Sequence, residues 1–224
     1  MTYQHRFVDG AVYPHALGKI VCVGRNYAEH AQELNNPIPT EPLLFIKPAT
    51  AAVDMREQLH IPQGLGACHH ELEVAILIGS TLRHASLDEA YAAIAGIGLG
   101  IDLTLRDLQQ QLKTQGHPWE RAKSFDGANP LSPFVPYVPA ANNREELQSL
   151  DFSLQVNGVA RQRGNTRDML FPIVPLLAHI SQWFTLQPGD VVMTGTPAGV
   201  SALMSGDTLL ATLADGVRVS SAVC

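Results

Sequence analysis

The sequence has few charged residues and few cysteines, and both shortages exclude classes of function. Only 16% of its 224 residues are charged, and the formal net charge is −6. The 15 lysine and arginine residues are scattered singly, so neither a nucleic-acid backbone nor an anionic membrane is expected as a partner. The three cysteines, Cys22, Cys68 and Cys224, are widely spaced and form no CxxC pair. This pattern favours a reducing compartment over a disulfide framework or a thiolate zinc site.

Long apolar runs and familiar nucleotide motifs are missing as well. The longest nearly apolar stretch, residues 91–101, is about half as long as a membrane span, so no transmembrane helix is expected. The first ten residues, MTYQHRFVDG, lack the basic-then-apolar pattern of a signal peptide, and we expect a soluble cytoplasmic protein. The chain contains no P-loop, no nucleophile-elbow serine motif and no internal repeat. Its length and its content of Val, Ile and Leu fit one folded domain.

The patterns that are present predict an α+β fold rich in strands. Residues 1–18 include an Asp-Gly turn between alternating apolar residues, which predicts a short hairpin, and residues 151–164 predict a second hairpin about an Asn-Gly turn. A Ser-x-x-Glu capping box at residues 86–89 begins a helix, and residues 106–116 form another that ends at a glycine. Strands outnumber helices and are mostly joined by hairpins. This favours a β-rich α+β fold over a doubly wound parallel sheet.

Three acidic residues are the strongest functional signal. Glu71 and Glu73 lie two apart in a strongly predicted strand, so their side chains share one face. Adjacent carboxylates repel each other and need a shared proton, a basic partner or a divalent cation, unless they simply reach solvent at the end of the strand. Asp102 follows a glycine-rich apolar run that we expect to be buried, and a buried carboxylate needs a partner. Three oxygen ligands without sulfur would suit Mg²⁺ or Mn²⁺ and would leave positions for water and substrate.

Histidines provide candidates for acid–base chemistry. His30 and Glu33 lie three residues apart in a segment, residues 27–35, that predicts a short helix. An imidazole beside a carboxylate is a candidate general base for a water molecule, and the alternative is a salt bridge on the helix surface. His69 and His70 are metal ligands by residue type. As neighbours in a strand they point to opposite faces, so they cannot both join the glutamates at one metal ion.

Cations near these residues indicate an anionic substrate. Lys47 ends an apolar strand just before a proline, and Lys123 lies in the segment WERAKSFDG beside aromatic residues. Arg106 and Gln109 lie three apart in a helix just after the aspartate, so they would share a face near the metal. Together with Arg25, they would be able to bind a carboxylate-bearing substrate. Each of these residues taken singly is more often a surface charge.

Seven motifs follow one another along the chain in a recognisable order. They are GRNYAEHAQE, LLFIKP, HHELEVAILIG, GIDLTLRDLQ, WERAKSFDG, VNGVARQRGNTRDM and PGDVVMTGTPAGV. In this order they resemble the fumarylacetoacetate hydrolase superfamily, and above all its short members that act on acylpyruvates or oxaloacetate. The resemblance implies a rolled mixed β-sandwich in a single catalytic domain, residues 19–224, preceded by the hairpin extension of residues 1–18. It also implies a homodimer with one Mg²⁺ or Mn²⁺ per chain.

The resemblance implies roles for individual residues as well. The metal-ligand positions of the family fall on Glu71, Glu73 and Asp102. The pair that holds the catalytic water, in members that order a short lid helix, falls on His30 and Glu33. The active-site lysine falls on Lys123. Substrate-contacting positions fall on Arg106, Gln109 and Thr196, with Arg25 and Lys47 as further carry-overs. Whether the lid segment of residues 28–40 is ordered without substrate does not follow from the sequence.

The activity ranked first is metal-dependent hydrolysis of the C–C bond of an acylpyruvate, such as acetylpyruvate or fumarylpyruvate, to pyruvate and a carboxylic acid. In this hypothesis His30 and Glu33 activate a water molecule, and the metal and Lys123 stabilise the departing enolate. The alternative is decarboxylation or tautomerisation of oxaloacetate, or isomerisation of a 2-oxo acid, through the same enolate. The expected partner is a small anionic 2-oxo acid in each case. A non-catalytic binding protein would have lost a metal carboxylate or the lysine, and neither is lost here.

Overall fold

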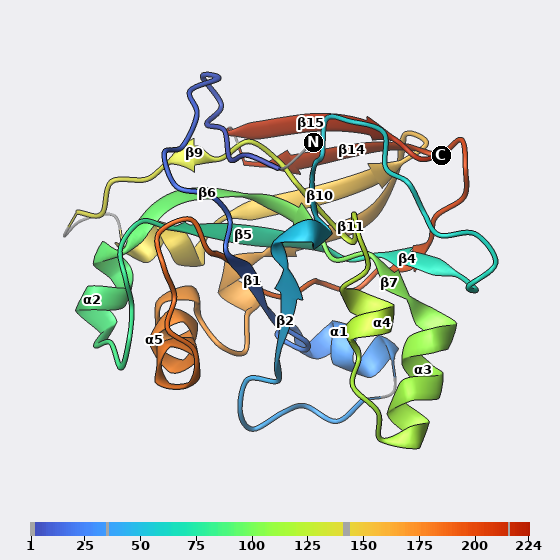
Figure 1. Cartoon of the computed structure of the whole chain (residues 1–224), viewed down its shortest axis with the longest axis horizontal. Coiled ribbons are helices and arrows are strands. Elements are labelled where there is room, and N and C mark those ends of the chain that lie inside the picture. Colours follow the sequence, from blue (N-terminus) through green and yellow to red (C-terminus); the bar gives the residue numbers. More distant parts are fainter. Residues whose placement is uncertain (1–2, 35, 141–143, 215) are drawn as a thin grey trace.

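The computed structural model describes residues 3–34, 36–140, 144–214 and 216–224, and it is built mainly from β-strands (Figure 1). The predicted segments 1–18 and 28–40 therefore contain positions 1, 2 and 35, which lie outside the described residues. The largest sheet of the described part is mixed and curled, with an edge strand β9 (Val135–Pro136) that pairs with β6. Its other strands lie in the order β2 (Leu44–Pro48), β1 (Lys19–Val23), β12 (Val191–Met193), β5 (Leu72–Ile78), β6 (Ile94–Ile101), β8 (Asn129–Leu131) and β3 (Ala52–Asp54).

Strands β5 and β6 form the buried centre of this sheet. Alternate residues of β5 pack into two separate apolar clusters, with Val74 and Ile76 in one and Ala75 and Leu77 in the other. This is the period-2 alternation of a strand that is covered on both faces. The glycines of β6 are needed for packing, since a Cβ at Gly100 would lie 2.6 Å from the end of a methionine side chain. The strand that ends at the predicted aspartate is therefore buried, as expected.

A second sheet covers the first and consists of hairpins, with the strand order β11 (Val159–Asn165), β10 (Asp151–Val156), β14 (Thr208–Leu213) and β15 (Val217–Ala222). The predicted turn at Asn157-Gly158 is confirmed, and both residues have positive φ angles of 53° and 76°. Such angles are those of a two-residue hairpin turn that matches the twist of its strands. Near the N-terminus, Arg6 and Val12 form one antiparallel bridge across the predicted Asp-Gly turn.

Helices lie at one side of the sheets, in two groups (Figure 1). They are α1 (Ala28–Glu33), α2 (Leu87–Ala92), α3 (Arg106–Gln115), α4 (Glu120–Lys123) and α5 (Ile173–Trp183), with short 3₁₀ turns at η1 (Ala49–Ala51), η2 (Arg144–Gln148) and η3 (Thr166–Asp168). The capping box of Ser86 and Glu89 is confirmed, and Gly116 ends α3 in the left-handed conformation. None of the described helices is long and apolar enough to cross a membrane.

The segment HHELEVAILIG forms two strands where one was expected. Its first part is β4 (Cys68–His70), which pairs with β13 (Ser201–Ala202) and β7 (Thr104–Leu105) in a small third sheet, whereas β5 belongs to the large one. The chain passes from one sheet to the other at Glu71, because the next backbone N–H, that of Leu72, donates to the side-chain oxygen of Gln162 at 3.0 Å. The Glu71 carbonyl accepts from the backbone N–H of Asp102 at 2.8 Å. The break thus brings two of the predicted metal ligands together.

Candidate active site

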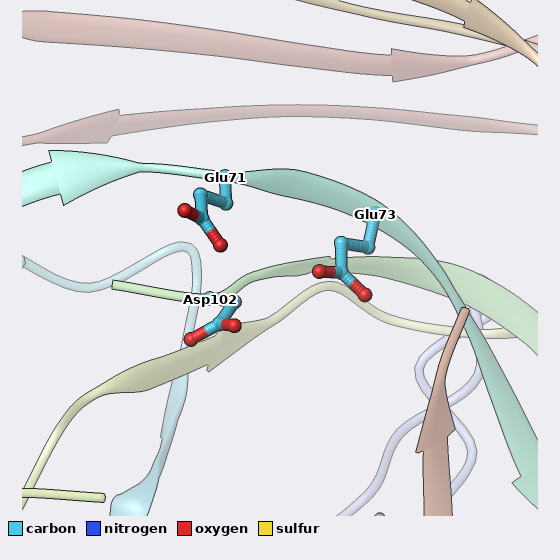
Figure 2. Close-up of side chains that lie close together, drawn as sticks. All are labelled: Glu71, Glu73 and Asp102. Carbon is cyan, nitrogen blue, oxygen red and sulfur yellow. The ribbon is translucent and has the colours of Figure 1, made fainter. Parts of the chain in front are cut away.

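The three predicted carboxylates converge in the interior. Glu71 lies at the break between β4 and β5, Glu73 lies in β5, and Asp102 directly follows β6. Figure 2 shows that the two glutamate side chains leave the strand on the same side and that all three carboxylates face one space. One oxygen of each lies within 4.8 Å of one oxygen of each of the others, and the three residues are only 2–4% exposed. Acids that simply reach solvent are therefore excluded at this position.

Cations partly balance this buried charge. The ammonium of Lys123 donates to Glu71 Oε2 at 2.7 Å, to Asp102 Oδ2 at 2.6 Å and to a threonine hydroxyl at 2.7 Å, so its three protons are all used. The Arg106 guanidinium donates to the other oxygen of Glu71. Burial raises the pKa of Glu71, but the positive charges of Lys123 and Arg106 outweigh burial, and the net pKa lies below its usual range. Glu71 is therefore an anion in the folded protein.

Glu73 has a different environment. Its carboxylate accepts the backbone N–H of Gly195 at 2.6 Å, and the ion pairs of the described residues do not include it. Burial, followed by the charge of Asp102, raises the pKa of Glu73 well above its usual range. Oxygen Oδ1 of Asp102 has no hydrogen-bond partner among the described residues, although the Lys47 ammonium lies 2.8 Å away in an ion pair without hydrogen-bond geometry. A carboxylate short of positive charge and a buried, unpartnered oxygen fit a hard divalent cation.

The predicted acid–base pair lies on α1. His30 Nδ1 lies 3.4 Å from Glu33 Oε2, and the histidine is buried whereas the glutamate is half-exposed. The Glu33 carboxylate accepts the backbone N–H of Gly199 at 3.0 Å, which fixes its position from the opposite side. Burial lowers the pKa of His30, and the nearby glutamates only partly offset this effect. At neutral pH the imidazole is therefore uncharged and able to accept a proton.

A small cavity of about 70 Å³ lies beside His30 and Glu71. Its wall includes His30, the carboxylate of Glu71 and several cations. The cations and amides that line it come from two helices and from the loops on either side of α1, and they are Arg25, Asn36, Arg106, Gln109, Gln110, Lys113 and Lys123. The volume is far below the several hundred Å³ of a drug-sized pocket, so the cavity suits a small, strongly anionic molecule.

Two predicted substrate contacts have other partners in the structure. Lys47 is fully buried and donates to the backbone carbonyls of Lys123 and Ala128, so it braces the chain behind Asp102. The Thr196 hydroxyl donates to the backbone carbonyl of Leu72 at 2.8 Å and accepts from an amide. Neither residue belongs to the lining of the small cavity. Their roles as substrate contacts stay predictions, and the contacts seen here are structural.

The structure also reveals supporting residues that the sequence did not indicate. Gln162 is fully buried, and its amide donates to the Thr196 hydroxyl at 2.7 Å while its oxygen accepts from His70 and from the backbone N–H of Leu72. It thereby joins the loop after β12 to the strand that carries the glutamates. The only sequence feature that could have indicated Gln162 is its place as a glutamine in the second strand of the predicted hairpin, most of whose residues are exposed in the structure. His70 is occupied by this network and is not among the grouped metal-ligand candidates of the described residues.

Known proteins share this arrangement of elements. Residues 19–223 match the family model described as fumarylacetoacetate (FAA) hydrolase C-terminal. The oxaloacetate tautomerase YcgM of Escherichia coli (strain K12) is 50% identical over 221 residues, which cover 99% of each chain. A solved structure from Oleispira antarctica is 54% identical, with a TM-score of 0.95 over 99% of this chain and 100% of that chain. The fumarylpyruvate hydrolase of Pseudomonas aeruginosa, solved with Mn²⁺ and pyruvate, is 32% identical, with a TM-score of 0.90 over 99% and 95% of the two chains.

Proposed function

Because this chain belongs to the fumarylacetoacetate hydrolase family, we propose that it is a metal-dependent enzyme that interconverts the keto and enol forms of oxaloacetate. The observation that carries the proposal is the small, cation-lined cavity beside three buried carboxylates. The 50% identity to a protein named oxaloacetate tautomerase supports this alternative more strongly than the 32% identity to a fumarylpyruvate hydrolase supports acylpyruvate hydrolysis, which the sequence alone ranked first.

Glu71, Glu73 and Asp102 would hold the divalent cation, for which Mg²⁺ is proposed and Mn²⁺ is an alternative. When bound, such an ion supplies Lewis-acid stabilisation of negative charge on the substrate oxygens. Mn²⁺ in the Pseudomonas aeruginosa structure supports this class of metal. Arg106 donates to the Gln109 side-chain oxygen at 2.8 Å as well as to Glu71, which holds the guanidinium and the Gln109 amide NH2 in place as donors for a 2-oxo carboxylate. Arg106 and Gln109 would orient the substrate beside Glu71.

His30 would move one proton between C3 and the C2 oxygen of oxaloacetate. Its Nδ1 is turned toward Glu33, which leaves Nε2 for the substrate, and its lowered pKa keeps it in the proton-accepting form. Burial lowers the pKa of Lys123, but the negative charges of Asp102 and Glu71 raise it by more than burial lowers it. The net pKa is therefore above its usual range. Its positive charge therefore persists beside the C2 oxygen, where negative charge develops during the transfer.

The direct test follows decay of the enol form of oxaloacetate by its ultraviolet absorbance, with metal-free protein and after addition of Mg²⁺ or Mn²⁺. We expect metal-dependent acceleration over protein-free buffer that contains the same ion, and loss of that acceleration in Glu73→Gln. A matched control is Asp126→Asn, an exposed carboxylate outside the cavity. Equal enol decay with and without the protein would overturn the proposal.

Acylpyruvate hydrolysis is a second candidate, and the geometry of His30 and Glu33 is the observation that supports it. A glutamate fixed by a backbone N–H beside a neutral histidine would also be able to activate a water molecule. Cleavage of acetylpyruvate and release of pyruvate from oxaloacetate should therefore be measured on the same preparation. Cleavage of acetylpyruvate without tautomerase activity would favour the hydrolase. Release of pyruvate from oxaloacetate would indicate decarboxylation. The predicted homodimer and cytoplasmic location stay predictions.

A further inference from the structure

Two cations at the outer end of the cavity share one neutral acceptor. Arg25 Nη2 donates to the side-chain oxygen of Asn36 at 3.0 Å, and Lys113 Nζ donates to the same oxygen at 3.2 Å. Both cations are half-buried and line the cavity. Among the described residues, neither belongs to an ion pair. The two positive charges are therefore held close together without a carboxylate between them.

The inner end of the same cavity differs in this respect. There, Arg106 and Lys123 are both paired with Glu71. At the outer end, burial lowers the pKa of Lys113, and the positive charges of Arg25 and Arg106 lower it further, with no acidic group opposing them. A protein with a net charge of −6 thus keeps an uncompensated positive site at this position. An anionic group placed there would relieve the repulsion between the two cations.

Helix α3 connects the two ends. Arg106, Gln109, Gln110 and Lys113 all line the cavity, and their spacing of three, four and seven residues places them along one face of the helix. Seven residues of α-helix rise about 10 Å, so Lys113 lies well beyond Arg106 along this face, and both side chains line the cavity. A molecule with an anionic group at each end therefore matches the wall better than one with a neutral tail.

We propose that Arg25 and Lys113 form a subsite for the distal carboxylate of a four-carbon 2-oxo dicarboxylate, a specificity role that deepens the proposed function and rests on it. Asn36 holds the two side chains in place through its single oxygen. The 2-oxo acid end lies beside Arg106 and Glu71, and the second carboxylate replaces the missing negative charge at the outer end. The subsite selects the dianion against a substrate of similar size whose far end is uncharged.

The test compares oxaloacetate with its 4-ethyl ester, which lacks the distal charge. In the double variant Arg25→Gln/Lys113→Gln we expect KM for oxaloacetate to rise about 10- to 100-fold, the usual loss for charge-assisted hydrogen bonds, with little change in kcat. The KM for the ester should stay unchanged. Lys113→Arg, which keeps the charge, should retain most of the affinity. Arg121→Gln is the matched control, because this arginine is exposed and does not line the cavity.

Binding is measured separately, by calorimetry of the Mg²⁺-loaded protein with 3,3-difluorooxaloacetate, which has no proton at C3 and cannot enolise. Tighter binding of this dianion to the wild type than to the double variant supports the subsite even if oxaloacetate is not turned over, in which case only the proposed function fails. Equal binding to both proteins, or an equal KM increase for oxaloacetate and its ester, overturns the subsite and leaves tautomerase activity to stand on its own assay.

Discussion

The inner and outer ends of the cavity are held in place to very different degrees. At the inner end, Glu71 and Asp102 lie at the ends of central strands and are joined by a backbone hydrogen bond and by the Lys123 ammonium, which donates to both carboxylates. At the outer end, Arg25 and Lys113 come from a loop and the last turn of a helix and share a single neutral oxygen. The inner end is buried and held by several hydrogen bonds and ion pairs, whereas Arg25 and Lys113 at the outer end are held by few contacts.

This difference separates the chemistry from the choice of substrate. Stabilisation of an enolate at the inner end serves hydrolysis, decarboxylation and tautomerisation alike, so the carboxylates alone do not select the reaction. His30 lines the same cavity and has Glu33 beside it, and a neutral imidazole is able to take a proton from water or from carbon. The ranking of hydrolysis first depended on this pair, and for that reason the more similar tautomerase relative outweighs it.

The largest effect is expected at the inner end. Asp102→Asn removes one of the three proposed metal ligands and a partner of Lys123. We expect loss of divalent-metal binding by calorimetry and a fall in kcat/KM for oxaloacetate of at least about 10³-fold, since several kcal/mol of charge stabilisation disappears. Asp126→Asn should retain full activity. Turnover by Asp102→Asn in metal-free buffer would show that the inner end works without a metal.

The next effect concerns His30, which lines the same cavity. His30→Ala should lower tautomerisation by about 10²–10⁴-fold, the range for a lost acid–base group, while metal affinity stays unchanged because the residue is not a ligand candidate. Rates for oxaloacetate and acetylpyruvate are compared on the same variant. If tautomerisation persists and only cleavage of acetylpyruvate disappears, His30 acts on water, and acylpyruvate hydrolysis becomes the better-supported function.

Glu33→Gln should have a smaller effect, about tenfold on the maximal rate, or about 1.4 kcal/mol, because Glu33 acts through His30. Burial lowers the pKa of His30, and the charge of Glu33 raises it in part, so removal of that charge lowers this pKa further. The base then stays unprotonated to lower pH, and the acid limb of the pH profile of kcat/KM should move to lower pH. The control is Glu29→Gln on the exposed face of the same helix. An unmoved acid limb in Glu33→Gln would contradict the positioning role.

The sequence predicted the residues of the inner end well, because the patterns that place them involve only neighbouring residues in the chain. The two-residue period of a strand placed Glu71 and Glu73 on one face, and the end of a glycine-rich strand placed Asp102 in the interior. The β-rich fold class, the Asn-Gly hairpin and the capping box follow from equally local patterns, and the structure confirms them.

The outer end depends on contacts that no local pattern encodes. Asn36 and Lys113 are 77 residues apart in the chain, and Gln162 reaches Leu72 across 90 residues. A contact of the same kind divides the expected strand at Glu71. The backbone N–H of Leu72 donates to the side chain of Gln162 and not to a neighbouring strand. Glu33 is fixed by Gly199, whose own motif predicts only a turn.

The smallest effect tests the inner end through stability. Without a metal ion, Glu73 and the Asp102 oxygen that accepts no hydrogen bond among the described residues are buried at a cost, so the metal should stabilise the fold. At a metal concentration 100-fold above Kd the gain is about 2.7 kcal/mol, and for a domain of this size EDTA should therefore lower the Tm by about 5–10 °C. Asp102→Asn should not respond to EDTA, which separates metal removal from any direct effect of the chelator. An unchanged wild-type Tm would mean that Lys47, Lys123 and Arg106 balance the carboxylates without a metal, and the contrast between a metal-braced inner end and a ligand-dependent outer end would disappear.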